Sequence, residues 1–410
     1  MKNRWKTRTL EEVCHFSNGL WKGENPPFVE VGVIRNTNFT KEGALDDSDI
    51  AYLAVEAKKL EKRRLQFGDI ILEKSGGGPR QPVGRVALFD KTEGVFSFSN
   101  FTAALRVRDP HELDFCFVHK YLHWIYLSGV TEGMQSHSTG IRNLDGDAYK
   151  AIPITYPALP EQRRLVGILA EAFAGIATAK ANAEKNLQNA HALFESHLQK
   201  VFTERDYGWL EKPLSELCVI KHGFAFKSEF FTGSGDYVLL TPGNFYESGG
   251  YRDRGEKQKY YSGDIPAGFV LSRGDLLIAM TEQAAGLLGS PVLIPEDGKF
   301  LHNQRLGLVT KKTGVPWVNE FFFHVFNTQP VRKAIHDGAS GVKVRHTSPT
   351  KIGEVVVSFP ASIAEQRTIV SKLTKLSEET QRLESIYRQK LSALGELKKS
   401  LLHQAFSGQL

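Results

Sequence analysis

The chain has 410 residues, 41% hydrophobic and 24% charged, which is ordinary globular composition and enough length for two to four domains. The net charge of +6 is compatible with a nucleic-acid partner but does not require one. There is no run of about eighteen apolar residues and no close pair among the three cysteines, so the sequence predicts no membrane span and no disulfide framework. Such a chain fits a reducing cytoplasm.

The first part of the chain is predicted to mix short strands with helices. Turn residues bound three β-prone runs, at Phe28–Val31, Asp69–Leu72 and Arg85–Phe89. A helical stretch follows from Asp114 to Leu127. The pattern favours an α+β class, and the order of the strands cannot be read from it.

A long helix is predicted next, from Glu161 to Phe202, because this stretch contains no proline and keeps one apolar face. At 1.5 Å per residue it would span on the order of 60 Å. Apolar residues recur every three or four positions along it, which is the spacing of an amphipathic helix. They are Leu165, Leu169, Ala172, Ile176, Ala179, Ala183, Leu187, Ala190, Phe194, Leu198 and Val201.

The second half of the chain repeats the first. Glu161-Gln162-Arg163 returns as Glu365-Gln366-Arg367, and Trp5, Leu10, Cys14 and Gly19 align with Trp209, Leu214, Cys218 and Gly223. Three strands are again predicted, at Tyr237–Leu240, Asp275–Ile278 and Pro291–Ile294, followed by a helix from Asn319 to Ala334. A second long helix has its stripe at Ile369, Leu373, Leu376, Leu383, Tyr387, Leu391, Leu394 and Leu401. Ser362 and Glu365 suggest a capping box at its start.

One long offset predicts two similar modules joined end to end. The expected division is two globular modules, 1–158 and 204–361, alternating with two long helices, 159–203 and 362–410. The apolar stripe of each helix needs a partner, so we expect the two helices to pair as an antiparallel intramolecular coiled coil with an approximate internal two-fold axis. The alternative is that each helix pairs with another chain.

Two variable modules alternating with two similar long helices resemble the specificity subunit of type I restriction–modification systems, over the whole chain. The features that carry the resemblance are Pro157 before Glu161, Pro360 before Glu365, Gly68-Asp69-Ile70 with Gly274-Asp275-Leu276, the segment 140–144, and the helix ends 198–202 and 402–408.

The resemblance implies a DNA-binding subunit without catalysis or a cofactor of its own. Each module would be a target recognition domain that binds one half of a split, asymmetric DNA sequence. The helices would act as a spacer and as the docking surface for two adenine methyltransferase subunits, and motor–endonuclease subunits would join that core.

Paired polar and basic loops are the candidate DNA contacts, because base edges and phosphates are bound by Arg, Lys, Gln, Asn, Ser and Thr. In the first module they are Lys74, Ser75, Gly77, Arg80, Gln81, Arg85, Ser138, Arg142 and Asn143. In the second they are Thr281, Gln283, Arg305, Lys343, Arg345 and His346. Weaker candidates are Lys22, Arg35, Asn38, Lys227 and Asn244.

Two other functions fit parts of the sequence. Asn25-Pro26-Pro27-Phe28 matches the motif with which amino-methyltransferases hold adenine, although nothing near it resembles the loop that holds the methyl donor. A protein-only coiled-coil scaffold is the second. Metal sites at Asp69 with Glu73, or at Cys116, His119 and His123, are weaker hypotheses than a packed structural role. The sequence contains no phosphate-binding Gly-Lys-Ser/Thr loop.

Overall fold

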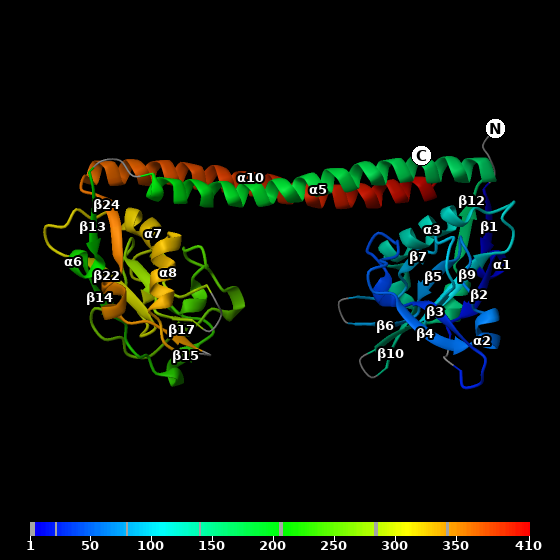
Figure 1. Ribbon diagram of the computed structural model, residues 1–410, viewed down its shortest axis with the longest axis horizontal. Coiled ribbons are helices and arrows are strands. Elements are labelled where there is room, and N and C mark those ends of the chain that lie inside the picture. The colour runs from blue at the N-terminus through cyan, green and yellow to red at the C-terminus, as the bar shows by residue number, and fades with distance from the viewer. Residues whose placement is uncertain are drawn as a thin grey trace. The chain divides into compact units, whose positions relative to one another are not determined.

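The computed structural model describes residues 5–20, 23–78, 81–138, 141–204, 208–282, 286–341 and 344–410. The chain forms two compact units (Figure 1). Unit 1 contains Met1–Glu184 and Arg388–Leu410, and unit 2 contains Lys185–Tyr387. Each unit therefore combines a globular part with a segment of both long helices.

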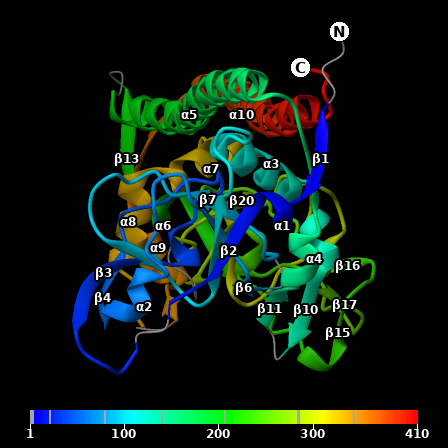
Figure 2. The same cartoon turned by 90° about the vertical axis from the view of Figure 1, so that its right-hand side faces the viewer.

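The globular part of unit 1 is built on a four-stranded antiparallel sheet in the order β2-β9-β5-β7. Its strands are β2 Cys14–Asn18, β9 Thr102–Val107, β5 Ile70–Glu73 and β7 Val86–Leu88. A three-stranded sheet, β4-β3-β8, adjoins it, and a two-stranded ribbon, β1-β12, leads towards the long helices (Figure 2). Their bounds are β1 Lys6–Thr9, β3 Phe28–Ile34, β4 Ala51–Glu56, β8 Phe96–Phe98 and β12 Pro153–Tyr156.

A third sheet of unit 1, in the order β10-β11-β6, lies at the end remote from the long helices (Figure 1). Its strands are β6 Ser75–Gly77, β10 Gln135–Ser138 and β11 Ile141–Leu144. Helix α3 packs against β7. The helices are α1 Leu10–Val13, α2 Ala57–Glu61, α3 Phe115–Leu127 and α4 Gly146–Lys150, with 3-10 turns η1 Asn36–Asn38 and η2 Val130–Met134.

Unit 2 repeats this plan. Its central sheet has the order β14-β22-β18-β20, its second sheet β15-β17-β16-β21, and its ribbon pairs β13 with β24. The strands are β13 Trp209–Pro213, β14 Cys218–His222, β15 Phe231–Thr232, β16 Tyr237–Leu239, β17 Tyr260–Tyr261, β18 Leu276–Ala279, β20 Pro291–Leu293, β21 Phe300–Leu301, β22 Leu306–Lys311 and β24 Val356–Pro360. A short ribbon pairs β19 Thr281–Glu282 with β23 Arg345–His346.

The helices of unit 2 show one correction. The single helix predicted from Asn319 to Ala334 is two helices, because Pro330 occupies the first turn of the second and the chain turns out of the helix at Thr328. The elements are α6 Leu214–Leu217, α7 Asn319–Asn327, α8 Gln329–Asp337 and α9 Pro349–Gly353, with 3-10 turns η3 Ser228–Phe230, η4 Pro242–Asn244 and η5 Gly255–Lys257.

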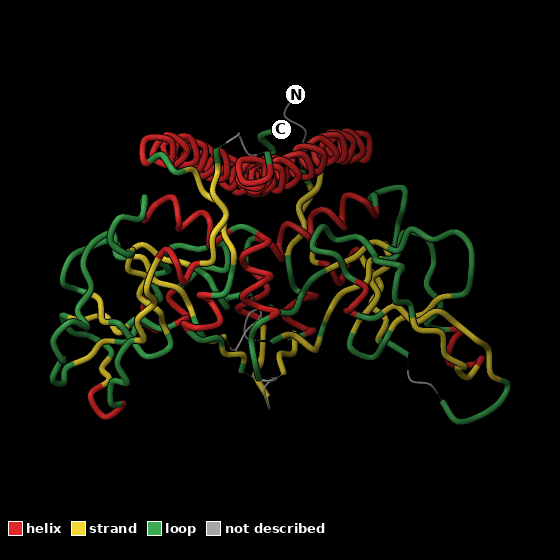
Figure 3. Tube along the Cα trace, turned by 60° about the vertical axis from the view of Figure 1, so that its left-hand side comes forward, coloured by secondary structure: helices red, strands yellow, loops and turns green. Residues whose placement is uncertain are grey.

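The two long helices are α5, Leu159–Thr203, and α10, Ile363–Phe406 (Figure 3). In unit 1, Leu165 near the start of α5 shares a core with Phe406 at the end of α10. In unit 2, Leu198 near the end of α5 shares a core with Leu373 near the start of α10. The start of each helix thus lies with the end of the other, which makes the pair antiparallel within the chain. Every residue of the two predicted stripes is buried or half-buried.

Helix α5 also contains a window that is long and apolar enough, by composition alone, to cross a membrane, with 11% of that window buried. Composition of this kind is weak evidence, because helices of soluble proteins share it. Its stripe residues Leu165 and Leu169 pack into the core of unit 1, and Phe173 packs against that core. The core of unit 1 therefore covers the apolar side of α5 near the start of the helix.

A buried glutamine explains why Glu-Gln-Arg recurs at the start of both helices. Gln162 is fully buried; its Oε1 accepts from Asp114 N at 2.9 Å, and its Nε2 donates to Pro157 O at 2.8 Å and Glu112 O at 3.0 Å. Gln366 makes the same three bonds in unit 2, with the N of Val318 and the carbonyl oxygens of Pro316 and Pro360. Each glutamine fixes the start of a long helix to the globular part of its own unit.

At the start of α10 the predicted capping box is half formed. Ser362 Oγ accepts from Glu365 N at 3.3 Å. The Glu365 carboxylate accepts instead from the indole N–H of Trp209, at 3.1 Å. This contact ties the ribbon strand β13 to the helix, and Trp209 is one of the residues that recur in the repeat.

The residues of both metal hypotheses have structural roles. Asp69 and Glu73 are buried and each binds an arginine, Arg106 and Arg85 respectively. Among the described residues, no group of three or more His, Cys, Asp or Glu is placed to hold a metal ion. His119 and His123 lie on α3 with stacked rings, 3% exposed each, beneath a turn whose Gly43 has a φ of 81°.

Burial lowers the pKa of His119 and of His123 to about 3; the nearby Lys120 adds to the lowering at both, and Lys398 adds to it at His123. Both imidazoles are therefore neutral in the folded chain, whereas in the unfolded chain they titrate near pH 6.5. Between about pH 3 and pH 6.5 the unfolded chain binds protons that the folded chain does not bind. The stability contributed by the two neutral histidines is therefore complete above about pH 6.5 and is lost as the pH falls towards 3.

We expect unit 1 to lose about 2 kcal/mol of stability for each of these histidines between pH 7.5 and pH 5. Denaturant unfolding at several pH values measures this loss. The double variant His119→Leu and His123→Leu should flatten the pH dependence, and His111→Asn, at an exposed histidine, should not. An unchanged pH profile in the double variant would show that other groups cause the acid sensitivity.

Candidate nucleic-acid interface

In unit 1 the structure joins the two polar loops that the sequence suggests separately. Strand β6 pairs with β11, so that Gly77 lies opposite Arg142 and Ser75 opposite Asn143. The Ser75 hydroxyl donates to Asn143 Oδ1 at 2.5 Å. Four of the predicted contact residues thus belong to one small sheet. Ser138 lies in β10 of the same sheet, although its side chain is outside the described part of the chain, as are Lys22 and Arg80 entirely.

A buried ion pair joins Arg85, just before β7, to Glu73 of β5. The Arg85 guanidinium binds both carboxylate oxygens of Glu73 at 2.8 Å and donates to Asn36 O at 3.0 Å. The Glu73 side chain is 1% exposed and that of Arg85 16%. Arg85, predicted as a DNA contact, already has its donors engaged, and the Gln81 side-chain amide lies within 3.2 Å of its guanidinium. Arg85 is therefore bound within the unit, where it supports Gln81 and the backbone near it.

Lys74 lies at the edge of this sheet. Its ammonium donates to Asn18 Oδ1 at 2.9 Å, and partial burial lowers its pKa. Arg35, one of the weaker candidates, binds Asp49 at 2.8 Å, and Asn38 is 1% exposed and holds the turn beside it. Asn38 is therefore part of the fold, and Arg35 is paired with Asp49.

In unit 2 the corresponding loops also meet. Strand β19 pairs with β23, so that Thr281 lies opposite His346 and Glu282 opposite Arg345. Gln283 and Lys343, both predicted contacts, lie outside the described residues. Asn244 is buried and holds the turn at Thr241, as Asn38 does in unit 1.

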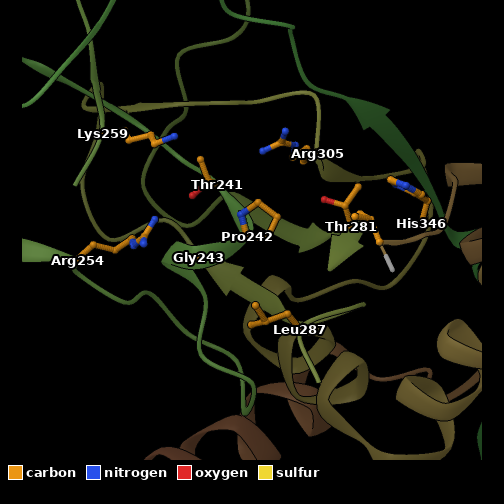
Figure 4. Close-up of a pocket in the computed structure, with 10 residues that line it drawn as sticks. Thr241, Pro242, Gly243, Arg254, Lys259, Thr281, Leu287, Arg305 and His346 are labelled. Carbon is orange, nitrogen blue, oxygen red and sulfur yellow. The ribbon is translucent and has the colours of Figure 1, made fainter. Parts of the chain in front are cut away.

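Three cations surround a cavity of about 470 Å³ beside this ribbon (Figure 4). Thr281, His346 and Arg305, all predicted, line it, and Arg254 and Lys259, which the sequence analysis missed, complete the set. No ion pair joins Arg254, Lys259 or Arg305 to another residue of the described chain; Lys259 Nζ lies 5.5 Å from the ring centroid of Phe231. The cavity therefore presents positive charge that is available to an anionic ligand.

Beneath the β19–β23 ribbon lies a cluster of buried charge. Glu282 is 4% exposed and accepts from Leu288 N at 2.9 Å, while Arg345 donates to His336 O at 3.1 Å. Burial lowers the pKa of Arg332 to about 10, opposed by the nearby Glu282 and Glu247. Arg345, a predicted contact, is thus engaged inside unit 2, much as Arg85 is in unit 1.

The two candidate interfaces have the same backbone hydrogen bonding but different side chains. Lys74 N donates to Phe101 O in unit 1, and Met280 N donates to Arg305 O in unit 2, which makes Phe101 and Arg305 equivalent positions. Unit 1 therefore presents a 43% exposed aromatic ring where unit 2 presents a guanidinium. The two modules therefore present different side chains at the same place in the fold.

The chain repeats one topology in two units. Each unit contains a segment of both antiparallel helices and a polar face built from loops. This arrangement defines a class of duplicated recognition proteins. Residues 2–188 and 207–391 match the family described as type I restriction modification DNA specificity domain. The chain belongs to this family, and each unit contains most of one copy of the domain.

Known relatives agree with this assignment. The chain is 27% identical over 220 residues to the type I restriction enzyme EcoBI specificity subunit of Escherichia coli, an alignment that covers 53% of this chain and 42% of that protein. The chain thus matches less than half of that relative's length. The HsdS subunit of Thermoanaerobacter tengcongensis has the same fold, with a TM-score of 0.63 at 17% identity and coverage of 99% and 97%.

A second solved structure is similar over the full length of both chains. It comes from work titled as the structural basis of complex assembly and conformational transition of the type I R-M system, with a TM-score of 0.78 at 17% identity. These two likenesses establish the fold. With the family match they favour neither a methyltransferase nor a protein-only scaffold. Consistent with this, Asn25–Phe28 enters β3, and Asn25 N donates to the buried Glu56 carboxylate at 3.4 Å.

Proposed function

We propose that this chain is the DNA-recognition subunit of a type I restriction–modification complex and that each globular part binds one half of a bipartite, asymmetric target. The observation that carries this is the pairing, in each unit, of two polar loops from distant parts of the sequence into one small sheet. Backbone pairing fixes the loops, and their side chains are free to differ between the two units. That is what reading two unlike half-sites requires.

The contact residues we propose for unit 1 are Lys74, Ser75, Gly77, Gln81, Ser138, Arg142 and Asn143, with Arg80 in the adjoining loop. For unit 2 they are Thr281, Gln283, Arg305, Lys343 and His346, joined by Arg254 and Lys259. We assign Arg85 and Arg345 to supporting these loops, since their guanidinium groups are already bound within the chain.

The helices would set the separation between the two reading surfaces, and we keep the division 1–158, 159–203, 204–361 and 362–410 as the functional one. Two adenine methyltransferase subunits would dock on the helix pair, and motor–endonuclease subunits would join them. We infer that methyl transfer and cleavage belong to those partners, in the cytoplasm, and that this chain needs no cofactor.

Mapping methylated adenines in DNA from cells with and without this chain tests the function directly. We expect one bipartite sequence to lose methylation when the chain is absent. For the purified chain with its methyltransferase partner, the logarithm of the affinity for that sequence should fall linearly with the logarithm of the salt concentration. Methyl transfer by the chain alone, or binding that ignores salt, would favour the two rejected functions.

A further inference from the structure

Unit 1 carries a second cationic surface that the loop sheet does not include. Helix α2 and the turn after it contain five basic residues and one acidic residue, Glu61. The five are Lys58, Lys59, Lys62, Arg63 and Arg64, and we call them the α2 patch. No ion pair joins any of them to another residue within the described chain, although many other cations of this protein are paired.

The patch is held firmly in place by its own backbone. Leu60 and Leu65, on either side, are buried, and Leu65 N donates to Phe96 O at 2.9 Å. The carbonyl of Arg63 accepts from the Ser97 hydroxyl at 2.9 Å, and that of Arg64 accepts from the Arg106 guanidinium at 3.3 Å. The backbone therefore holds five cations close together in sequence and space. Their mutual repulsion is unfavourable unless an anion binds there.

Asn18 connects the α2 patch to the candidate interface. The backbone oxygen of Asn18 accepts from Arg63 Nε at 3.2 Å, and its side-chain oxygen accepts from Lys74 Nζ at 2.9 Å. Lys74 immediately precedes β6, so Asn18 contacts both the patch and the residue that leads into the loop sheet. Both lie at the end of unit 1 remote from the long helices (Figure 1).

The equivalent segment of unit 2 has no such patch. It also runs from the second sheet to the Gly-Asp turn of the central sheet, with Leu271 N donating to Phe300 O as Leu65 does to Phe96. That segment, 262–270, reads Ser-Gly-Asp-Ile-Pro-Ala-Gly-Phe-Val and has a single charge, which is negative. Conversely, three cations of unit 2 surround its cavity, where unit 1 has Phe101 in place of Arg305.

We propose that the α2 patch binds the phosphate backbone of DNA next to the half-site read by unit 1. The two units would then contact phosphates through different parts of the same fold. This rests on the proposed function. Such contacts would position the duplex without reading its sequence. They would therefore contribute affinity and salt dependence equally on target and non-target DNA.

The test is the triple variant Lys58→Gln, Lys62→Gln and Arg64→Gln, at three exposed positions, in the full chain with its methyltransferase partner. We expect the slope of log affinity against log salt to fall by about 2–3, at roughly 0.9 for each phosphate contact. Affinity at 0.15 M salt should fall at least tenfold on both a target duplex and a random-sequence duplex, with their ratio unchanged within about twofold.

A matched control removes three exposed cations of unit 2 that lie outside the long helices and the proposed DNA contacts, through Arg273→Gln, Lys311→Gln and Lys351→Gln, and should leave the slope unchanged. If the control lowers the slope equally, net charge rather than the patch is responsible and the proposal falls. The proposal is also overturned if the patch variant keeps the slope of the unmodified chain, or if it loses binding to the methyltransferase subunit instead of binding to DNA. Absence of salt-dependent binding by the unmodified complex would instead refute the proposed function. The single variants K58Q and K62Q give the same comparison should the triple variant be unstable.

Discussion

Replacing Arg254, Lys259 and Arg305 by glutamate should weaken DNA binding about 10³-fold at 0.15 M salt. The variant removes the three unpaired cations around the cavity of unit 2 and adds repulsion in their place. Because the loop sheet of unit 1 is untouched, the loss should concern only the half-site read by unit 2. Binding to duplexes with one or the other half-site scrambled measures this separation.

A control reverses three exposed cations elsewhere on unit 2, with Arg273→Glu, Lys311→Glu and Lys351→Glu. Its affinity should fall far less, and equally on all duplexes. Equal loss at both half-sites in the cavity variant would contradict modular recognition.

Gln162→Leu should destabilise unit 1 by about 3–5 kcal/mol. The substitution leaves one buried backbone N–H and two carbonyl oxygens without the hydrogen bonds that the Gln162 amide makes with them. Leucine has a similar volume, so the cost arises mainly from the lost hydrogen bonds. Denaturant unfolding followed by probes in each unit should report the change in unit 1, because unit 2 has its own Gln366.

Gln188→Ala, at an exposed position on the same helix, serves as the comparison and should change stability by less than about 0.5 kcal/mol. If Gln162→Leu is equally mild, the buried amide does not fix the helix to the globular part. The reciprocal variant Gln366→Leu should transfer the effect to unit 2.

Local patterns predicted most of the secondary structure. The stripes of α5 and α10 were readable because helix periodicity is local, and the strands at Phe28, Ile70 and Pro291 because turn residues bound them. The break at Thr328 escaped prediction because the apolar run before it continued the helical pattern up to Pro330. Strand order could not be read, since pairing such as β2 with β9 joins residues far apart in sequence.

The candidate interface was predictable only as two separate loops in each half. Their union depends on the β6–β11 and β19–β23 pairings, which are non-local. Arg254 and Lys259 were missed for the same reason: each is an isolated surface cation until the fold places it beside Arg305. Arg85 looked like an accessible arginine because nothing local signals that the Glu73 carboxylate binds it from below.

The aromatic contacts of Phe406 bear on the order in which this protein can be built. Its ring lies 5.3 Å from those of Phe117 and Tyr121 and 5.6 Å from that of Trp124, so the last turn of α10 completes the interior of unit 1. Unit 1 therefore stays unfinished until synthesis has reached the end of α10, although most of its residues are made before those of unit 2. Unit 2, whose segments are contiguous, can close earlier, and a chain cut short before Leu402 would lose the unit that was synthesised first.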